Sequence, residues 1–397
     1  MSNPIDKQEI KDLAAESFES VRSTRRHLHA HPELSFVEHE TSRYVQGQLQ
    51  EIGVPFQAGI VETGIVGMIE GAHDGPTVAL RADLDALPIL EQNEVEYKSR
   101  NEGVMHACGH DVHTASLLGA ARILNGVKDR LHGNVKLIFQ PGEERLPGGA
   151  SLMIKENVLE NPRPSAVVGQ HVFPELEAGQ VGFKTGMYMA SCDEIHVTVK
   201  GRGGHGAMPH KNIDPILIAS HLVVALQQIV SRHADPEIPT VLSFGHFIGQ
   251  GATNVIPNEV TLAGTFRTFN EEWRAEAHRK MIALAESMVQ SMGGTVDFRI
   301  DKGYPYLINE PDLTARSRTY AEAYLGKENV MDLSLRMTAE DFSYYSQVAP
   351  ACFYRLGVAD FAKGIDKPVH NAQFDIDEQA LLTGAGLMAW IAVQELS

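Results

Sequence analysis

The sequence has few cysteines and no long apolar run. Its three cysteines, Cys108, Cys192 and Cys352, are odd in number and scattered over 397 residues. That usage does not predict a disulfide framework, so we expect free thiols or metal ligands. No stretch reaches the roughly 18 consecutive apolar residues that a membrane-spanning helix needs. Internal repeats and low-complexity segments are also absent from the sequence.

Positive charge is also scarce. The chain has 34 Lys and Arg against 51 Asp and Glu, a formal net charge of -17. Because such a charge repels phosphate backbones and anionic lipid, we expect no nucleic-acid or membrane partner and instead a small-molecule substrate. The opening MSNPIDKQEIKDLAAE lacks a basic segment followed by an apolar run, which favours a cytoplasmic location.

The pattern of apolar residues predicts an α/β fold. Ile10, Ala14, Val21 and Leu28 recur at helical spacing, so a long helix is expected up to His31 and Pro32. Apolar strands and helices then alternate, in the order 76–88, 114–124, 134–140, 149–157 and 165–172. Such alternation is typical of a mostly parallel sheet with helices on both faces.

The order of elements changes in the middle of the chain. Between about 191 and 300 the pattern predicts strand, helix, strand, strand, helix, strand, the βαββαβ order of a ferredoxin-like unit. The α/β pattern then returns. At this length two domains are expected. We therefore predict a first domain of residues 1–186 and 303–397, interrupted by an inserted domain of residues 187–302.

Polar side chains follow several of the predicted strands. In α/β sheets, the ligand crevice lies at the carboxyl ends of the strands. The side chains at these ends combine thiol, imidazole and carboxylate groups, a donor set that zinc, manganese and cobalt accept. They are Asp83, Asp85, Cys108, His110, Glu143, Glu144, His171 and, far downstream, His370.

The neighbouring Glu143 and Glu144 are the most informative pair. Adjacent side chains on an extended segment point in different directions, so one carboxylate can bind metal while the other faces substrate. Metal-assisted hydrolysis needs this division, because a general base must remove a proton from the activated water. The alternative is a pair of solvated surface glutamates.

Two other functions compete with a metallohydrolase. A cysteine hydrolase would use Cys108 as the nucleophile with His110 or His113 as its activating base. A protein that only binds ligands would have no need of the base Glu143. Chelation separates the two enzymes, because removing metal would spare a thiol enzyme.

The inserted domain has a polar cluster of its own, in GRGGHGAMPH. Glycines around His205 would let the backbone approach a substrate closely, although a glycine-rich turn explains them equally well. Arg267 is expected on the strand face opposite Val260, Leu262 and Phe266, as a carboxylate clamp or a solvent-facing arginine.

Nearly the whole chain resembles the dinuclear metal-dependent amidohydrolases, which include hippurate hydrolases, auxin-conjugate hydrolases and N-acyl-amino-acid deacylases. The resemblance is carried, in order, by RRHLHAHPELSFVE, LRADLDALPI, MHACGHDVHTASLLGAA, IFQPGEE, KGRGGHGAMPH, NVIPNEVTLAGTFRTF, TAEDFSYY and HNAQFDIDEQAL. It implies a zinc-peptidase-like catalytic domain and a lid domain that usually dimerises. One departure, GEERLPGGA, replaces a shorter glycine run and affects the expected pocket rim.

The same resemblance assigns roles to individual residues. It implies two divalent ions (Zn, Mn or Co) and Glu143 as general base, with His205 steadying the intermediate from the partner subunit. Asn254 and Arg267 match positions that hold the substrate carbonyl and carboxylate. The implied activity is hydrolysis of N-acyl-L-amino acids by a homodimer or higher oligomer, with dipeptidase or carboxypeptidase action as the alternative. The implied metal ligands are Cys108, His110, Glu144, His171 and His370.

Overall fold

The structure is a computed structural model, and it describes residues 4–397. Its first helix is α1 (Lys7–Ala30). Asp6 caps it by accepting a hydrogen bond from the backbone N–H of Glu9. Ile10, Val21 and Leu28 are among the residues that it buries. The helix ends directly before His31 and Pro32, where the sequence predicted its end.

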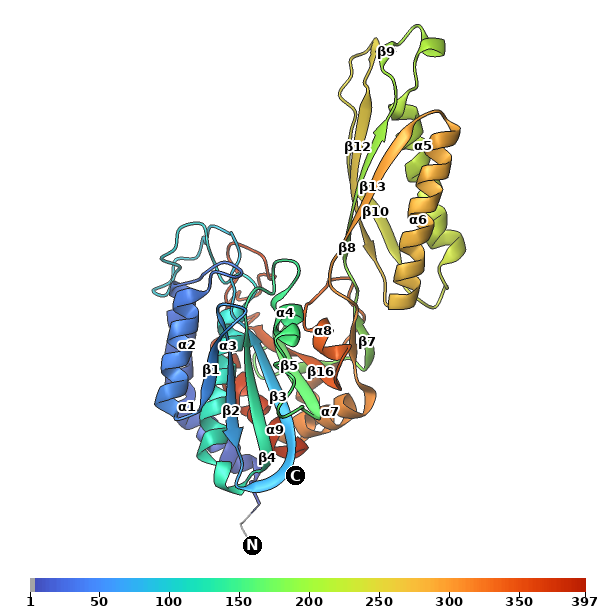
Figure 1. The fold of residues 1–397 in the computed structure, drawn as a ribbon. Coiled ribbons are helices and arrows are strands. Elements are labelled where there is room, and N and C mark those ends of the chain that lie inside the picture. Colours follow the sequence, from blue (N-terminus) through green and yellow to red (C-terminus); the bar gives the residue numbers. More distant parts are fainter. Residues whose placement is uncertain (1–3) are drawn as a thin grey trace. The chain divides into compact units, whose positions relative to one another are not determined.

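A mixed sheet forms the centre of the first unit (Figure 1). Within the described residues it has eight strands in the order β1-β2-β4-β3-β5-β16-β6-β15. The neighbours β4, β3, β5 and β16 run parallel, whereas β1-β2, β2-β4 and β16-β6 pair antiparallel. The predicted α/β fold with a mostly parallel, mixed sheet is therefore confirmed. The strand bounds are β1 (Phe56–Ile60), β2 (Gly64–Glu70), β3 (His73–Asp83), β4 (His132–Gln140), β5 (Ala166–Glu177), β6 (Val181–Phe183), β15 (Val330–Asp332) and β16 (Ala351–Ala359).

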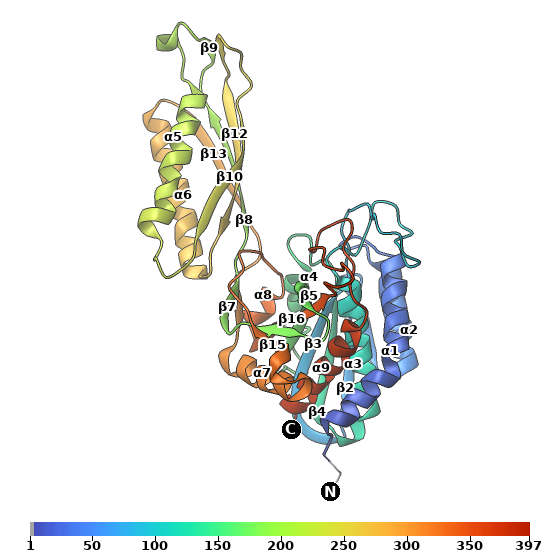
Figure 2. The same ribbon diagram turned by 180° about the vertical axis from the view of Figure 1, so that it is seen from behind.

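Helices cover both faces of this sheet. Helices α1, α3 and α9 pack against one another on the face toward the viewer in Figure 2, and α4 and α8 pack together on the other face. Nearly every residue of α3 and α9 is buried, because each helix lies between the sheet and further helices. The bounds are α2 (His39–Ile52), α3 (His110–Gly126), α4 (Gly149–Lys155), α7 (Pro311–Leu325), α8 (Ser343–Ser346) and α9 (Ala380–Glu395), with short 3-10 turns at Lys128–Arg130 and Lys327–Asn329.

The second unit is an antiparallel sheet backed by two helices. In the described part of the chain this sheet has four strands in the order β10-β12-β8-β13, and the chain follows the predicted βαββαβ order. The elements are β8 (Asp193–Lys200), β9 (Gly204–His205), α5 (Pro215–Gln228) continued by a π-helical turn (Ile229–His233), β10 (Val241–Ile248), β11 (Val255–Ile256), β12 (Glu259–Arg267), α6 (Glu271–Ser291) and β13 (Thr295–Lys302), with a 3-10 turn at Pro209–Lys211.

One face of this second sheet is apolar and packs on α5 and α6. Val197, Val260 and Phe266 belong to its buried cluster, with residues of both helices. At the end of the sheet, the buried Arg274 donates hydrogen bonds to both carboxylate oxygens of Asp193. Burial alone would raise the pKa of Asp193, but the bonds from Arg274 and His278 outweigh it and lower that pKa.

The structure divides into two compact units, whose bounds differ from the predicted domain bounds by a few residues. The first unit ends at Tyr188, where we expected residue 186, and it resumes at Ile308, where we expected residue 303. The chain passes between the units at β7 (Gly186–Met189) and β14 (Leu307–Asn309). The segment Arg336–Glu340 also belongs to the second unit, a return that the sequence pattern did not indicate.

Helix α5 and its extension are unusually apolar. The segment Pro215–His233 is the one described helix long and apolar enough, by length and composition, to cross a membrane. Its buried residues, including Ile218, Leu222 and Leu226, pack in the apolar cluster of the second unit. We therefore assign it as a core helix with one partly exposed face.

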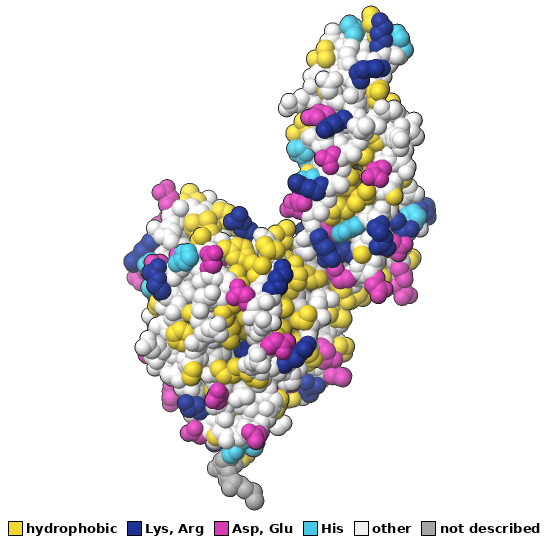
Figure 3. Space-filling model, in the orientation of Figure 1, with side chains coloured by type: hydrophobic (Ala, Val, Ile, Leu, Met, Phe, Trp, Pro, Cys, Tyr) yellow, Lys and Arg dark blue, Asp and Glu magenta, His cyan; other side chains and the backbone are white. Residues whose placement is uncertain are grey.

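Surface charge is mixed on the side of the molecule that Figure 3 displays. Acidic and basic side chains are interspersed there and do not form a continuous basic surface.

Candidate metal centre

The strands of the first sheet bring the predicted site residues to one edge. In the parallel pair β3 and β4, Asp83 lies opposite Gln140, so both strands end at the same level. Strand β5 runs beside β3 in the same direction and continues past this edge, carrying His171. Side chains that follow β3 and β4 therefore meet His171 where these strands end.

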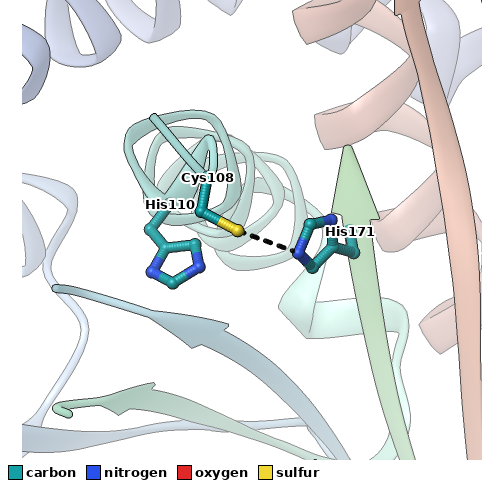
Figure 4. Close-up of side chains that lie close together, drawn as sticks. All are labelled: Cys108, His110 and His171. Carbon is teal, nitrogen blue, oxygen red and sulfur yellow. Dashed lines mark hydrogen bonds between the residues drawn. The ribbon is translucent and has the colours of Figure 1, made fainter. Parts of the chain in front are cut away.

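A tight turn places Cys108 beside His171. Gly109, at the N-terminus of α3, has a φ of 81°, and a Cβ atom there would lie 2.6 Å from a methyl carbon of Val172. Only glycine fits this position without strain. The turn brings Cys108 Sγ to 3.5 Å from His171 Nε2, while His110 extends from the start of α3 toward the same space (Figure 4).

Both buried histidines have their Nδ1 atoms engaged. His110 Nδ1 lies 3.2 Å from Asp85 Oδ1, and His171 Nδ1 donates to the carbonyl of Val172 at 2.8 Å. Among the described residues, His110 Nε2 is buried without a hydrogen-bond partner. Metal-binding histidines usually have this arrangement: one ring nitrogen is hydrogen-bonded to a carboxylate or a carbonyl, and the other is free to bind the metal.

Glu143 and Glu144 have different surroundings. Glu144 Oε1 lies 3.2 Å from His370 Nε2. Glu143 Oε1 accepts the backbone N–H of Asp341 at 3.3 Å, and its Oε2 lies 4.0 Å from His110 Nε2. The two residues lie in a turn, so the extended segment assumed from the sequence is wrong. The carboxylates nevertheless have separate partners, as the division of roles requires.

His370 completes the cluster from a distant part of the chain. Its backbone N–H donates to the carbonyl of Ala107 at 2.7 Å, which fixes its segment beside the turn that carries Cys108. Its φ of 64° is unusual for a residue with a side chain, and such strain often occurs at functional sites. The His370 side chain is half exposed, so this side of the cluster is open to solvent.

Acidic groups dominate the electrostatics of the cluster. Burial, followed by the charges of Glu144 and Glu143, raises the pKa of the Cys108 thiol well above its usual range. Burial lowers the pKa of His110, but the nearby Asp83 and Asp85 outweigh it and raise that pKa to about 10. Surplus negative charge of this kind is stabilised by a bound cation, which would also deprotonate the thiol.

The donor atoms fit two neighbouring cations. Cys108, His110 and His171 form one group whose potential ligand atoms all lie within 4.8 Å of one another. Cys108, Glu144 and His370 form a second such group and share the thiol with the first. Sulfur, nitrogen and oxygen donors together suit zinc and similar transition metals. All five ligands expected from the sequence thus lie in one cluster.

His113 and Asp83 have roles that the sequence did not specify. His113 Nδ1 lies 2.6 Å from Asp83 Oδ1, and its Nε2 accepts the backbone N–H of Val172. Because both nitrogens are engaged, His113 is not placed to activate Cys108. Asp83 also accepts a hydrogen bond from the buried Arg81, which donates to Asp341 as well. Hydrogen bonds and ion pairs thus connect His113, Asp83 and Arg81 to Asp341, the residue whose N–H donates to Glu143.

The other predicted residues lie in the second unit. His205 in β9 pairs with Val255 in β11, so the neighbouring Asn254 lies close to it, and both residues are exposed. His205 Nδ1 accepts the N–H of Ala207 at 3.1 Å, which leaves the ring proton on Nε2. Arg267 ends β12 on the polar face of the sheet, as its strand parity predicted.

Known proteins resemble this chain over most of its length. Peptidase family M20/M25/M40 matches residues 79–394. An N-acyl-L-amino acid amidohydrolase of Geobacillus stearothermophilus is 44% identical over 305 residues, covering 77% of this chain and 82% of that protein. Thermostable carboxypeptidase 2 of Saccharolobus solfataricus is 36% identical, covering 98% of both chains.

A solved structure extends the likeness to the fold. It is a Bacillus subtilis protein described as a dinuclear metal binding peptidase from the M20 family. The two proteins are 33% identical in sequence and superpose with a TM-score of 0.82. The match covers 96% of this chain and 99% of the Bacillus subtilis protein. The resemblance seen in the sequence motifs is confirmed: the chain belongs to peptidase family M20/M25/M40 and is a hydrolase of that family.

Proposed function

We propose that the protein hydrolyses the amide bond of N-acyl-L-amino acids and releases a carboxylic acid and a free amino acid. The separate surroundings of Glu143 and Glu144 carry this proposal, because they provide a base beside a complete set of metal donors. The amidohydrolase relative from Geobacillus stearothermophilus supports the choice of substrate class.

The proposed chemistry assigns one task to each group. Two divalent ions, bound by Cys108, His110, Glu144, His171 and His370, would lower the pKa of a water molecule and polarise the amide carbonyl. Glu143 takes the proton of the attacking water and then delivers it to the leaving amine nitrogen. The N–H of Asp341 holds the Glu143 carboxylate in place for both transfers.

We assign His205 to the stabilisation of the negatively charged oxygen that develops at the carbonyl. Its Nε2 proton is the donor that this role needs. His205→Ala should lower turnover on the order of 10²–10³-fold, the usual loss of such a donor, with unchanged metal content. Steady-state kinetics and elemental analysis measure both, with the exposed His210→Ala as the matched control. Equal turnover in His205→Ala and the parent protein would refute this role.

We also propose that the chain forms a homodimer, or a higher oligomer, through its second unit, and that His205 serves the partner's site. Two features support this. Leu217 and Val224 on α5 are 51% and 73% exposed, and β10 is an edge strand. Mixing His205→Ala chains with Glu143→Gln chains should then restore part of the activity, because one of the two sites in a mixed dimer is intact. An absence of recovery in verified mixed dimers would contradict this assignment.

We propose that Asn254 contacts the substrate carbonyl and that Arg267 binds the substrate's free carboxylate. Arg267→Ala should lower kcat/KM far more for an N-acyl-amino acid than for the matching N-acyl-amino amide, which has no charge to bind. Arg299→Ala, on the same sheet and exposed, is the control and should leave both values unchanged. Equal losses on the acid and the amide would show that Arg267 has a structural role.

The alternative is a dipeptidase or carboxypeptidase, which the relative from Saccharolobus solfataricus favours. A hydrolysis panel separates the two activities. It contains acetyl, benzoyl, indolyl-acetyl and aminoacyl conjugates of several amino acids, each assayed with added zinc, manganese or cobalt. We expect the highest kcat/KM on an acyl conjugate. Higher values on aminoacyl conjugates would favour the peptidase, and a lack of turnover across the panel would contradict both.

A further inference from the structure

The C-terminal half of α1 contains a buried cation whose contacts reach two of the segments that carry predicted metal ligands. Arg25 is fully buried in the first unit. Its Nε donates to Asp111 Oδ2 at 2.8 Å, and one of its terminal nitrogens donates to Asp375 Oδ1 at 2.8 Å. The proposed chemistry makes no use of Arg25, although it lies in the RRHLHAHPE motif.

The two carboxylates belong to different segments of the candidate metal centre. Asp111 directly follows His110 at the start of α3, whereas Asp375 lies on the segment that begins with His370. These segments already meet where His370 N–H donates to the carbonyl of Ala107. Arg25 joins them a second time, so the position of His370 relative to His110 is fixed at two points.

Further contacts hold both carboxylates in place. His29, one turn after Arg25, places Nδ1 2.8 Å from Asp111 Oδ2 and Nε2 3.2 Å from Glu91. The hydroxyl of Tyr97 donates to Asp375 Oδ2 at 2.8 Å. The left-handed backbone of His370 is a strained conformation, and strain of this kind persists only where the surrounding structure enforces it.

We propose that Arg25 is a positioning residue that sets the distance between His110 and His370 and thereby the affinity of the metal centre. The inference rests on the proposed function, since it assumes that these histidines bind metal. Residues that do not bind the metal themselves but orient its ligands commonly contribute about 10–100-fold to metal affinity. An ion pair that served only the fold would instead change stability and leave the affinity of the folded protein unchanged.

The neighbouring Arg26 provides a matched control. It donates two hydrogen bonds to Glu378, at 2.7 and 2.6 Å, and so also joins α1 to the C-terminal part of the chain. No contact of Arg26 with Asp111 or Asp375 is found among the described residues. Asp375→Ala removes the hydrogen bonds that Asp375 accepts from Arg25 and Tyr97, and it leaves the buried pair of Arg25 and Asp111 intact. It therefore remains informative if Arg25→Lys fails to fold.

The experiment titrates Zn²⁺ into metal-free protein in competition with a chelating dye, for the parent, Arg25→Lys, Asp375→Ala and Arg26→Gln. The Tm of each metal-free protein is measured in parallel. We expect two ions per parent chain, an affinity for at least one ion weakened about 10-fold or more in Asp375→Ala and Arg25→Lys, and a parental affinity in Arg26→Gln.

Several results would overturn the proposal. Parental affinity in Asp375→Ala, with or without a lower Tm, would leave Arg25 a purely structural role. An equal loss in Arg26→Gln would show that any loosening of the C-terminal segment weakens binding. If the parent chain itself binds no Zn²⁺, the proposed metal centre fails and this inference fails with it.

Discussion

Replacing Glu143 by glutamine should abolish most turnover while metal binding stays intact. The amide keeps the size of the side chain but no longer accepts the proton of the attacking water. General acid-base catalysis contributes about 10²–10⁴-fold, so kcat should fall by at least that factor. Glu143 is buried and hydrogen-bonded to the N–H of Asp341, and glutamine can retain this contact through its carbonyl oxygen. Metal content and the affinity for a substrate-like inhibitor should therefore match the parent protein.

Three measurements on identically prepared samples check this expectation: elemental analysis, inhibitor titration and steady-state kinetics. Parental turnover in Glu143→Gln would remove the general base from the account. Loss of metal would mean that Glu143 is a ligand and that the roles of the two glutamates are reversed.

The corresponding change at Glu144 should affect the metal itself. Glu144→Gln replaces an anionic oxygen beside His370 with a neutral amide, a far weaker ligand for divalent metals. We expect less than the full complement of metal after dialysis and a loss of activity that excess zinc, manganese or cobalt partly restores. Elemental analysis before and after reconstitution measures this. Full metal retention in Glu144→Gln, together with parental activity, would exclude Glu144 as a ligand.

The thiol-hydrolase alternative fits the site poorly. A nucleophilic cysteine needs a lowered pKa or an adjacent base that accepts its proton. Burial and the neighbouring glutamates raise the pKa of Cys108, while burial and the charge of Arg355 lower the pKa of the adjacent His171. Both groups are therefore neutral and unreactive unless a cation displaces the thiol proton.

The core elements could be predicted because their apolar periodicity is local. Helices such as α1 and α6 and strands such as β4 and β8 bury side chains at spacings that the sequence displays directly. The β1-β2 hairpin and the return of Arg336–Glu340 to the second unit were missed. The hairpin is local, but β1 is mostly exposed and so lacks a clear apolar alternation. The return of Arg336–Glu340 depends on contacts between segments that are distant in the sequence, which leave no periodic signal.

The clustering of the candidate ligands could be predicted because polar residues follow apolar strands and because the motifs resemble a known family. The supporting groups were not recoverable in this way. Arg81 reaches Asp341, and Arg25 reaches Asp375, across most of the chain. A buried arginine within an apolar strand or helix looks like a surface residue in the sequence, because its partner is visible only after folding. Arg81 and Asp341 lie in the motifs LRADLDALPI and TAEDFSYY, but the sequence does not show that they form an ion pair.

We propose that a two-metal centre in the first unit performs amide hydrolysis. The most direct measurement is the rate of hydrolysis of an N-acyl-amino acid as zinc, manganese or cobalt is added back to chelator-treated protein, with bound metal determined at each point. We expect negligible activity in the metal-free protein and a rate that rises until two ions are bound per chain. Full activity in protein shown to contain no metal would contradict it.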